Sequence, residues 1–112
     1  MKKAQIKKLD RLFQQQVLKN RVSVLGGIAV VAHHFIGRSN LATRWYLPNG
    51  VGLSHNQHQS VHSDTQIKQI LDTRLGKERI ADLYQKSNII ADYLYYDFIV
   101  EHLMGEREYY IM

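Results

Sequence analysis

Histidines are concentrated in a short part of this chain, where five of the six lie between His33 and His62. His33 and His34 close an apolar, β-branched segment, whereas His58 and His62 stand four residues apart after an Asn-Gly pair. Neighbouring residues of a strand point to opposite faces, and residues four apart on a helix share a face. The spacing therefore predicts a strand, a turn and a second strand that lead into a helix carrying the second pair.

Hydrophobic periodicity and turn residues predict the elements around this unit. Apolar steps of three and four over residues 3–20 indicate an amphipathic helix with a lysine-rich outer face. The β-branched segment 28–35 predicts the first strand, and residues 51–53 predict the second. Between them, residues 37–50 are rich in Gly, Ser and Asn and hold the only proline, so they predict a loop.

Capping residues predict the helices that follow. Ser54 with Gln57 three residues later matches the capping box, which begins a helix. Asp64-Thr65 begins the next helix, which runs to about Leu75 and ends at Gly76. A further helix covers residues 77–88. The last, over 89–104, is apolar on nearly every face and must be buried. It predicts a homodimer through 89–104, unless the first helix covers it within a monomer.

Composition limits the class of protein. At 112 residues the chain predicts one domain. A net charge of +5 favours a polyanionic partner. Without cysteine, any metal must be held by imidazole, carboxylate or water. The basic start lacks the apolar core of a leader peptide, and no apolar window is long enough for a membrane span. We expect a soluble, cytoplasmic protein with no membrane partner.

Three of the histidines suit a metal site. A strand histidine and a helical pair can close around one ion and leave the fourth tetrahedral position open, as in catalytic sites. The other member of the adjacent pair is then left to act as a base, since imidazole accepts a proton near neutral pH. A helical histidine pair alone is more often plain polar surface. The joint pattern of strand pair, Asn-Gly and helical pair favours the metal site.

The same residues resemble a known family. The order His-His, Asn, His, x3, His matches the HNH endonucleases, with fifteen residues from His34 to Asn49, nine to His58 and four to His62. The words AHHFIGRSN, TRW, NGVGL and SHNQHQSVHSD are similar to those of small phage and prophage HNH proteins, and the likeness spans roughly residues 5–90. It implies an α+β fold: a ββα-metal finger with a short antiparallel hairpin over 28–66, an N-terminal helix and lead-in over 1–27, and C-terminal helices over 67–112.

The resemblance also implies roles for individual residues in DNA cleavage. His33, His58 and His62 would bind one divalent ion, which could be Zn, Mg, Mn or Ni. His34 would be the general base, and Asn49 would brace the loop that orients it. Arg38 and Arg44 would clamp phosphates and help to neutralise the transition state, which makes Arg38 a catalytic candidate, and His55 would contact DNA. Trp45 and Tyr46 are expected to anchor the loop, and His102 is expected to be structural.

One departure from the family concerns a structural metal. Many phage relatives hold a zinc ion between two Cys-x2-Cys knuckles, at positions that correspond here to Val22 and Leu25 and to Ser54 and Gln57. No cysteine remains, so we expect no zinc knuckle. Apolar packing at Val22 and Leu25 and the Ser54 cap, worth about 1 kcal/mol, should replace it.

Two other functions remain open at this point. The chain could be a finger that holds DNA without cutting it, as part of a phage assembly. It could also be a three-histidine zinc hydrolase of small molecules, although 112 residues leave little room for a deep pocket.

Overall fold

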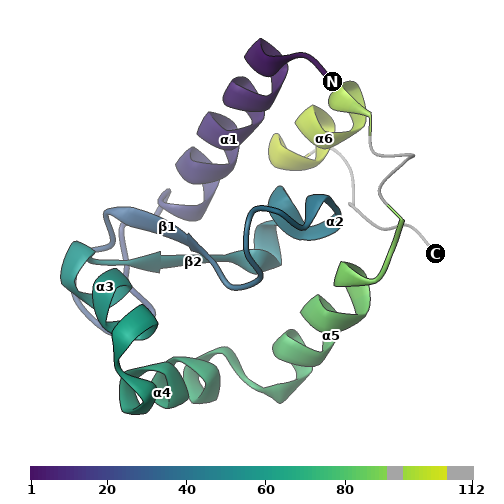
Figure 1. The fold of residues 1–112 in the computed structure, drawn as a ribbon. Helices are drawn as coiled ribbons and strands as arrows, with labels where there is room; N and C mark the ends of the chain where they lie inside the picture. Colours follow the sequence, from purple (N-terminus) through teal and green to yellow (C-terminus); the bar gives the residue numbers. More distant parts are fainter. Residues whose placement is uncertain (91–94, 106–112) are drawn as a thin grey trace.

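The structure is a computed structural model that describes residues 1–90 and 95–105. In chain order its elements are α1 (Lys3–Val17), β1 (Val31–His34), α2 (Leu41–Arg44), the 3-10 helix η1 (Leu47–Asn49), β2 (Gly50–Leu53), α3 (His55–Ser63), α4 (Thr65–Leu75), α5 (Lys77–Ser87) and α6 (Tyr96–Leu103). Helices thus surround a two-stranded antiparallel sheet, and the class is α+β, as predicted. In Figure 1 the hairpin lies at the centre, between α1 and α6 on one side and α3 and α4 on the other.

The hairpin and α1 are in close contact. β1 and β2 pair antiparallel, with His34 opposite Gly50. A Cβ atom at position 50 would overlap Val17 and lie 2.8 Å from Phe13 Cζ. Glycine at this position is what allows α1 to rest directly on β2, because any side chain would force the two apart.

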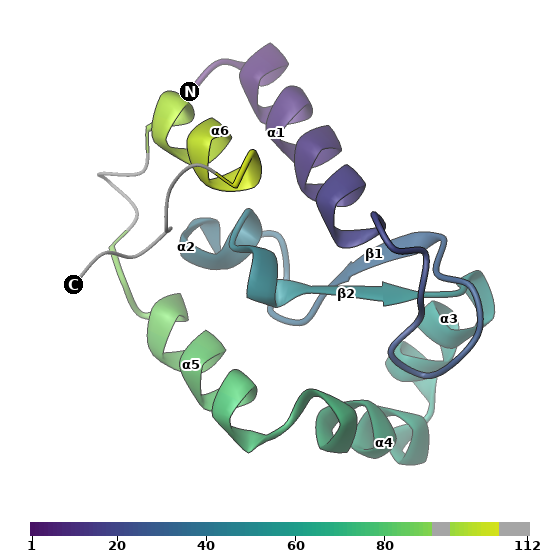
Figure 2. The ribbon, with the colours of Figure 1, turned by 180° about the vertical axis from the view of Figure 1, so that it is seen from behind.

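Two apolar clusters hold the helices on this hairpin. The first joins α1 and α6 to the segment after α2, and its buried members are Leu9, Phe13, Trp45, Ile99 and Leu103. The second joins β2 to the α3–α4 pair, and its buried members are Val51, Leu53, Val61, Leu71 and Leu75. Figure 2 shows the same arrangement from behind, with α1 and α6 again side by side. Each side chain buried in this way contributes about 2 kcal/mol.

The predicted boundaries of the first two helices after the hairpin, α3 and α4, are confirmed. Ser54 accepts a hydrogen bond from the Gln57 amide, and the Gln57 side chain accepts one from the Ser54 amide. Asp64 caps α4 by accepting from the amides of Gln66 and Ile67. Gly76 ends α4 with a φ of 89°, a conformation that favours glycine. These hydrogen bonds join side chains to main-chain groups only two or three residues away. The helix boundaries that they set can therefore be recognised in the sequence.

The segment before β2 is more regular than predicted. Residues 37–50 contain the helical turns α2 and η1 instead of an irregular loop. Asn40 caps α2 through a hydrogen bond from the Thr43 amide. Trp45, only 2% exposed, then fixes the segment in the first cluster. The strands and α1 are also slightly different in length from their predictions, since α1 ends at Val17 and β1 begins at Val31.

The prediction of one helix over 89–104 was wrong at its start. The side chains of Ser87 and Asn88 both bond to the Tyr84 carbonyl, and α5 ends there. Ile89 and Ile90 are not helical, residues 91–94 lie outside the described residues, and α6 begins only at Tyr96. The α6 helix buries Ile99 and Leu103 against α1 within the same chain. The homodimer remains a prediction, and these two residues no longer argue for it.

Hydrogen bonds connect the two segments in which the phage relatives hold their structural zinc. Val22 is 68% exposed, so the expected apolar packing there was wrong, whereas Leu25 does pack against the second cluster. Ser23 is buried instead and donates to Gln57 Oε1, and Gln57 Nε2 donates to the Gly26 carbonyl at 2.9 Å. A side chain of α3 therefore ties the lead-in segment down by hydrogen bonds. Ser23 is 34 residues from its partner, which is why the sequence did not reveal it.

Candidate metal centre

The adjacent histidines of β1 face opposite ways, as predicted. The ring centroid of His33 lies 5.1 Å from that of His58 and 5.3 Å from that of His62, both on α3. The ring of His34 instead lies against Phe13 of α1, with centroids 4.7 Å apart. The alternation of the strand thus sends one imidazole to α3 and the other to α1.

Three imidazoles come together at α3. His58 and His62 are one helical turn apart, and their Nε2 atoms are 3.3 Å from each other. Each of His33, His58 and His62 offers a ring nitrogen, and all three nitrogens lie within 4.8 Å of one another. His33 is buried, His58 half-buried and His62 exposed. Within the described residues this is the one group of three or more potential ligands of this kind.

The donor set fits a divalent ion. Nitrogen ligands about 2.0–2.1 Å from a tetrahedral metal are about 3.3 Å apart, which is the separation of the two α3 nitrogens. Burial, followed by repulsion from His58 and His62, lowers the pKa of His33 to about 4. Burial likewise lowers the pKa of His58. Both rings therefore stay neutral at neutral pH and keep the lone pair that a metal requires.

The ring of His34 is held in one orientation by the main chain. Its Nε2 lies 3.0 Å from the Arg44 carbonyl oxygen, which can only accept a hydrogen bond. In the neutral ring Nε2 therefore carries the proton, and Nδ1 keeps a lone pair. Burial lowers the pKa of His34 against the opposing effect of this hydrogen bond. His34 is thus neutral and able to accept a proton at neutral pH.

Asn49 makes three hydrogen bonds within the segment that holds His34. It is completely buried and accepts a hydrogen bond from the Ile36 amide at 2.7 Å. Its amide group donates to the carbonyls of Ile36 and Thr43. The carbonyl next to that of Thr43 belongs to Arg44 and receives the bond from His34. Asn49 therefore positions His34 through the main chain.

The two predicted phosphate-binding arginines meet at a carboxylate that the sequence did not single out. Asp10 of α1 accepts from Arg38, from Arg44 through two atoms, and from Trp45 Nε1. Burial would raise the pKa of Asp10, but the bonds from Arg44 and Trp45 outweigh it and lower the pKa. Asp10 lies 28 to 35 residues from these partners, so no local pattern indicates the contact.

The arginines differ in how available they are. The Arg44 side chain is 16% exposed, and its Nε and Nη2 atoms donate to the two carboxylate oxygens of Asp10. Arg44 therefore helps to hold α1 in place. The Arg38 side chain is 61% exposed and lines the cleft at the metal centre. Phosphate binding stays a prediction for both and is better supported for Arg38.

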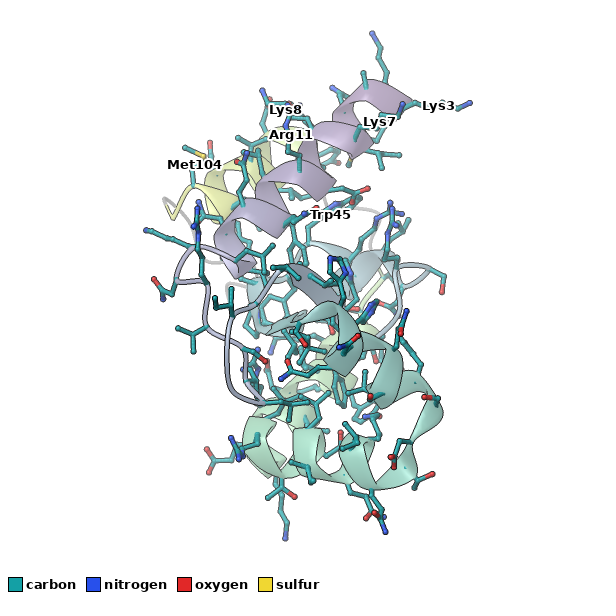
Figure 3. All side chains as sticks on the ribbon, turned by 90° about the vertical axis from the view of Figure 1, so that its left-hand side faces the viewer. Lys3, Lys7, Lys8, Arg11, Trp45 and Met104 are labelled. Carbon is teal, nitrogen blue, oxygen red and sulfur yellow. The ribbon has the colours of Figure 1, made fainter. Side chains whose placement is uncertain are left out.

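The remaining predicted residues are placed as follows. Trp45 lies beneath α1 as a buried anchor (Figure 3). Tyr46 donates to Asp82 Oδ2 at 2.7 Å, so it also anchors its segment. His102 is buried and accepts from the Leu47 amide, in keeping with its structural role. His55 is exposed at the start of α3, outside the group of three.

All four histidines of the pattern line one cleft. It has a volume of about 390 Å³ and lies between α1, β1 and α3. Its walls include Phe13, Gln14, Arg38, His33, His34, His58 and His62.

Comparisons with protein-family models, curated proteins and solved structures found no match for the chain. In the described part of the chain, no helix combines the length and apolar character that crossing a membrane requires.

Proposed function

We propose that the protein is a metal-dependent endonuclease that hydrolyses DNA phosphodiester bonds, with an HNH-type ββα-metal finger made by β1, β2 and α3. The observation that carries the proposal is the convergence of His33, His58 and His62 in a cleft that His34 also lines. A ligand triad and a base in one cleft can together supply the two contributions that speed diester hydrolysis, a Lewis acid and a proton acceptor.

The ligand triad defines the first part of the mechanism. His33 from β1 and the pair His58 and His62 from α3 would hold one divalent ion through neutral ring nitrogens. Such an ion supplies Lewis-acid stabilisation of the charge that develops on the phosphate and on the leaving 3′ oxygen. The exposed position of His62 leaves the centre open to a large substrate.

His34 would provide the second part. Its Nδ1 would accept a proton from the attacking water as the water oxygen bonds to phosphorus and the P–O3′ bond breaks. The leaving 3′ oxygen takes up a proton from solvent. The imidazolium that forms keeps its Nε2 bond to the Arg44 carbonyl, which favours the charged ring. Phe13, through its ring contact with His34, and Asn49, through the main chain, would act as positioning residues.

The charge of the chain supports nucleic acid as substrate. Fifteen Lys and Arg against ten Asp and Glu give a net charge of +5. A cleft of about 390 Å³ that opens to the surface also suits one phosphate of a polymer better than an enclosed small molecule. We place the biological role in phage or prophage DNA processing, such as recombination or packaging, on the resemblance alone.

A plasmid-nicking assay tests the proposal. Purified protein incubated with supercoiled plasmid and Mg²⁺, Mn²⁺, Ni²⁺ or Zn²⁺ should produce nicked circles, and excess EDTA should stop the reaction. Readdition of the ion should restore it. DNA binding without nicking in any of these ions would overturn the enzyme and favour the non-cleaving finger.

A further inference from the structure

Charge is distributed very unevenly along the chain. Residues 1–44 contain nine Lys and Arg and a single carboxylate, Asp10, which is a net charge of +8. Residues 45–112 contain six Lys and Arg and nine Asp and Glu, a net charge of −3, which completes the overall +5. Because Asp10 is already bonded to Arg38 and Arg44, it does not neutralise the rest of this half. The positive charge therefore belongs to α1 and the segment that follows it.

The outer face of α1 carries a row of cations. Lys3, Lys7 and Arg11 are spaced by four residues, so they share one face and rise by about 6 Å at each step. All three are exposed, and none forms an ion pair with a carboxylate in the part of the chain that the structure describes. Figure 3 shows these side chains, with Lys8, along the outside of α1. A row of unpaired cations attracts an extended polyanion.

The row leads to the metal centre. Gln14 follows Arg11 by three residues on the same face and lines the cleft of the four histidines. It also lines a second groove, of about 610 Å³, between α1 and residues 21–30. That groove holds the cations Arg11, Lys19 and Arg21, and none of its described lining residues is acidic. The cleft and the groove therefore meet at Gln14.

We propose that the face of α1 formed by Lys3, Lys7 and Arg11, together with the adjoining groove, binds the DNA backbone on one side of the cleaved phosphate. The inference rests on the proposed function for the position of that phosphate. Lys7 and Arg11 contact successive phosphates, and Lys19 and Arg21 contact the strand as it passes the groove. These contacts are independent of base sequence.

The packing of α1 argues against a lipid surface as the partner. An amphipathic helix binds a membrane through its apolar face. In α1 that face is occupied, because Leu9 and Phe13 are 0% and 1% exposed against α6 and Trp45. Only the charged face is available, which suits a soluble polyanion.

The test compares two double variants that remove the same charge. Lys7→Gln with Arg11→Gln changes the proposed surface. Arg74→Gln with Lys77→Gln removes one lysine and one arginine from exposed positions of α4 and α5, on the other side of the hairpin (Figure 1). Each protein is titrated against a fluorescent 20-base-pair duplex in EDTA, where nothing is cleaved, across a series of salt concentrations. Circular dichroism checks that each variant folds.

The expected result is a selective loss of backbone contacts. Each lost phosphate contact lowers the slope of log affinity against log salt by about 0.9, so Lys7→Gln with Arg11→Gln should lower it by about two. Its affinity near 0.1 M salt should fall roughly ten- to a hundredfold. The matched pair at Arg74 and Lys77 should remain close to wild type.

Three outcomes would overturn the inference. These are an unchanged slope in the α1 variant, equal losses in both variants, or no binding of DNA by the wild type. In the last case, binding of polyglutamate that depends on Lys7 and Arg11 would identify an acidic polypeptide as the partner. If binding depends on Lys7 and Arg11 but plasmid is never nicked, the docking surface stands and the proposed nuclease does not.

Discussion

The imidazole ring of His34 lies stacked on the phenyl ring of Phe13, with centroids 4.7 Å apart and planes inclined by 19°. The Arg44 carbonyl holds the Nε2 edge of the same ring. Phe13 fixes the plane of the imidazole and Arg44 its rotation, so α1 and the α2 segment together orient the proposed base. A fixed orientation is what makes a base effective, since misplacement by about 1 Å can cost a hundredfold in rate.

Replacing His34 by alanine should abolish cleavage and spare metal binding. The base is lost while all three ligands remain, and loss of a general base typically costs about 10²–10⁴-fold in rate. Initial rates of plasmid nicking and metal titration by calorimetry measure the two effects. His55→Ala, an exposed histidine outside the triad, serves as the control for metal affinity. Cleavage at the wild-type rate by His34→Ala would show that another group is the base.

His58→Ala and His62→Ala should each weaken metal affinity and activity together. Each removes one of three protein ligands, so the loss should exceed the roughly 10–100-fold typical of outer-shell partners. Calorimetric titration of the variants beside His55→Ala separates a ligand from a neighbouring histidine of the same helix. If both retain full affinity, carboxylates such as Asp64 would have to bind the ion instead.

Asn49→Ala should destabilise the protein and slow cleavage. It removes the side chain that accepts from the Ile36 amide and donates to the Ile36 carbonyl, whereas the Thr43 carbonyl keeps its bond from the Tyr46 amide. Unsatisfied buried groups cost about 1–3 kcal/mol each, so the free energy of unfolding should fall by about 3 kcal/mol. Urea denaturation measures this. Asn88→Ala, at an exposed position, is the matched control and should lose far less.

The metal-free protein should lose stability as the pH falls below neutral. The pKa of His33 is about 4 in the fold and near 6.5 in the unfolded chain, so the unfolded chain binds more protons between these values. This contribution is complete above pH 6.5 and is lost as the pH falls toward 4, by about 2 kcal/mol between pH 7 and 5. Urea unfolding in EDTA at several pH values tests it. His33→Gln should flatten the dependence, and His55→Gln should not.

Local signals made much of this fold predictable. The Ser54 cap, the Asp64 cap and the glycine at 76 are contacts within a few residues, so their sequence patterns identify them. The histidine pairs were also predictable, because the alternation of a strand and the repeat of a helix fix which side chains share a face. The convergence of His33 with the α3 pair followed from these two periodicities and a short hairpin.

Contacts between distant segments were not predictable. Asp10 meets Arg44, Ser23 meets Gln57, and Phe13 meets His34, each pair separated by 21 to 34 residues. Such contacts depend on how α1 and the lead-in segment dock on the hairpin, which no local pattern encodes. Hydrophobicity alone also misplaced the start of α6, since it could not distinguish a buried helix from the non-helical residues Ile89 and Ile90.

The Asn49-Gly50 pair also bears on how the protein ages. Asparagine before glycine is chemically labile, because the glycine amide nitrogen can attack the side-chain carbonyl and form a succinimide that opens to aspartate or isoaspartate. Here the attacking amide is bonded to the Leu47 carbonyl, and the Asn49 side chain is fixed by its own three bonds. Deamidation therefore requires unfolding. A carboxylate formed at position 49 in the unfolded state would face the Ile36 and Thr43 carbonyls on refolding, and this repulsion would prevent the native structure from forming again.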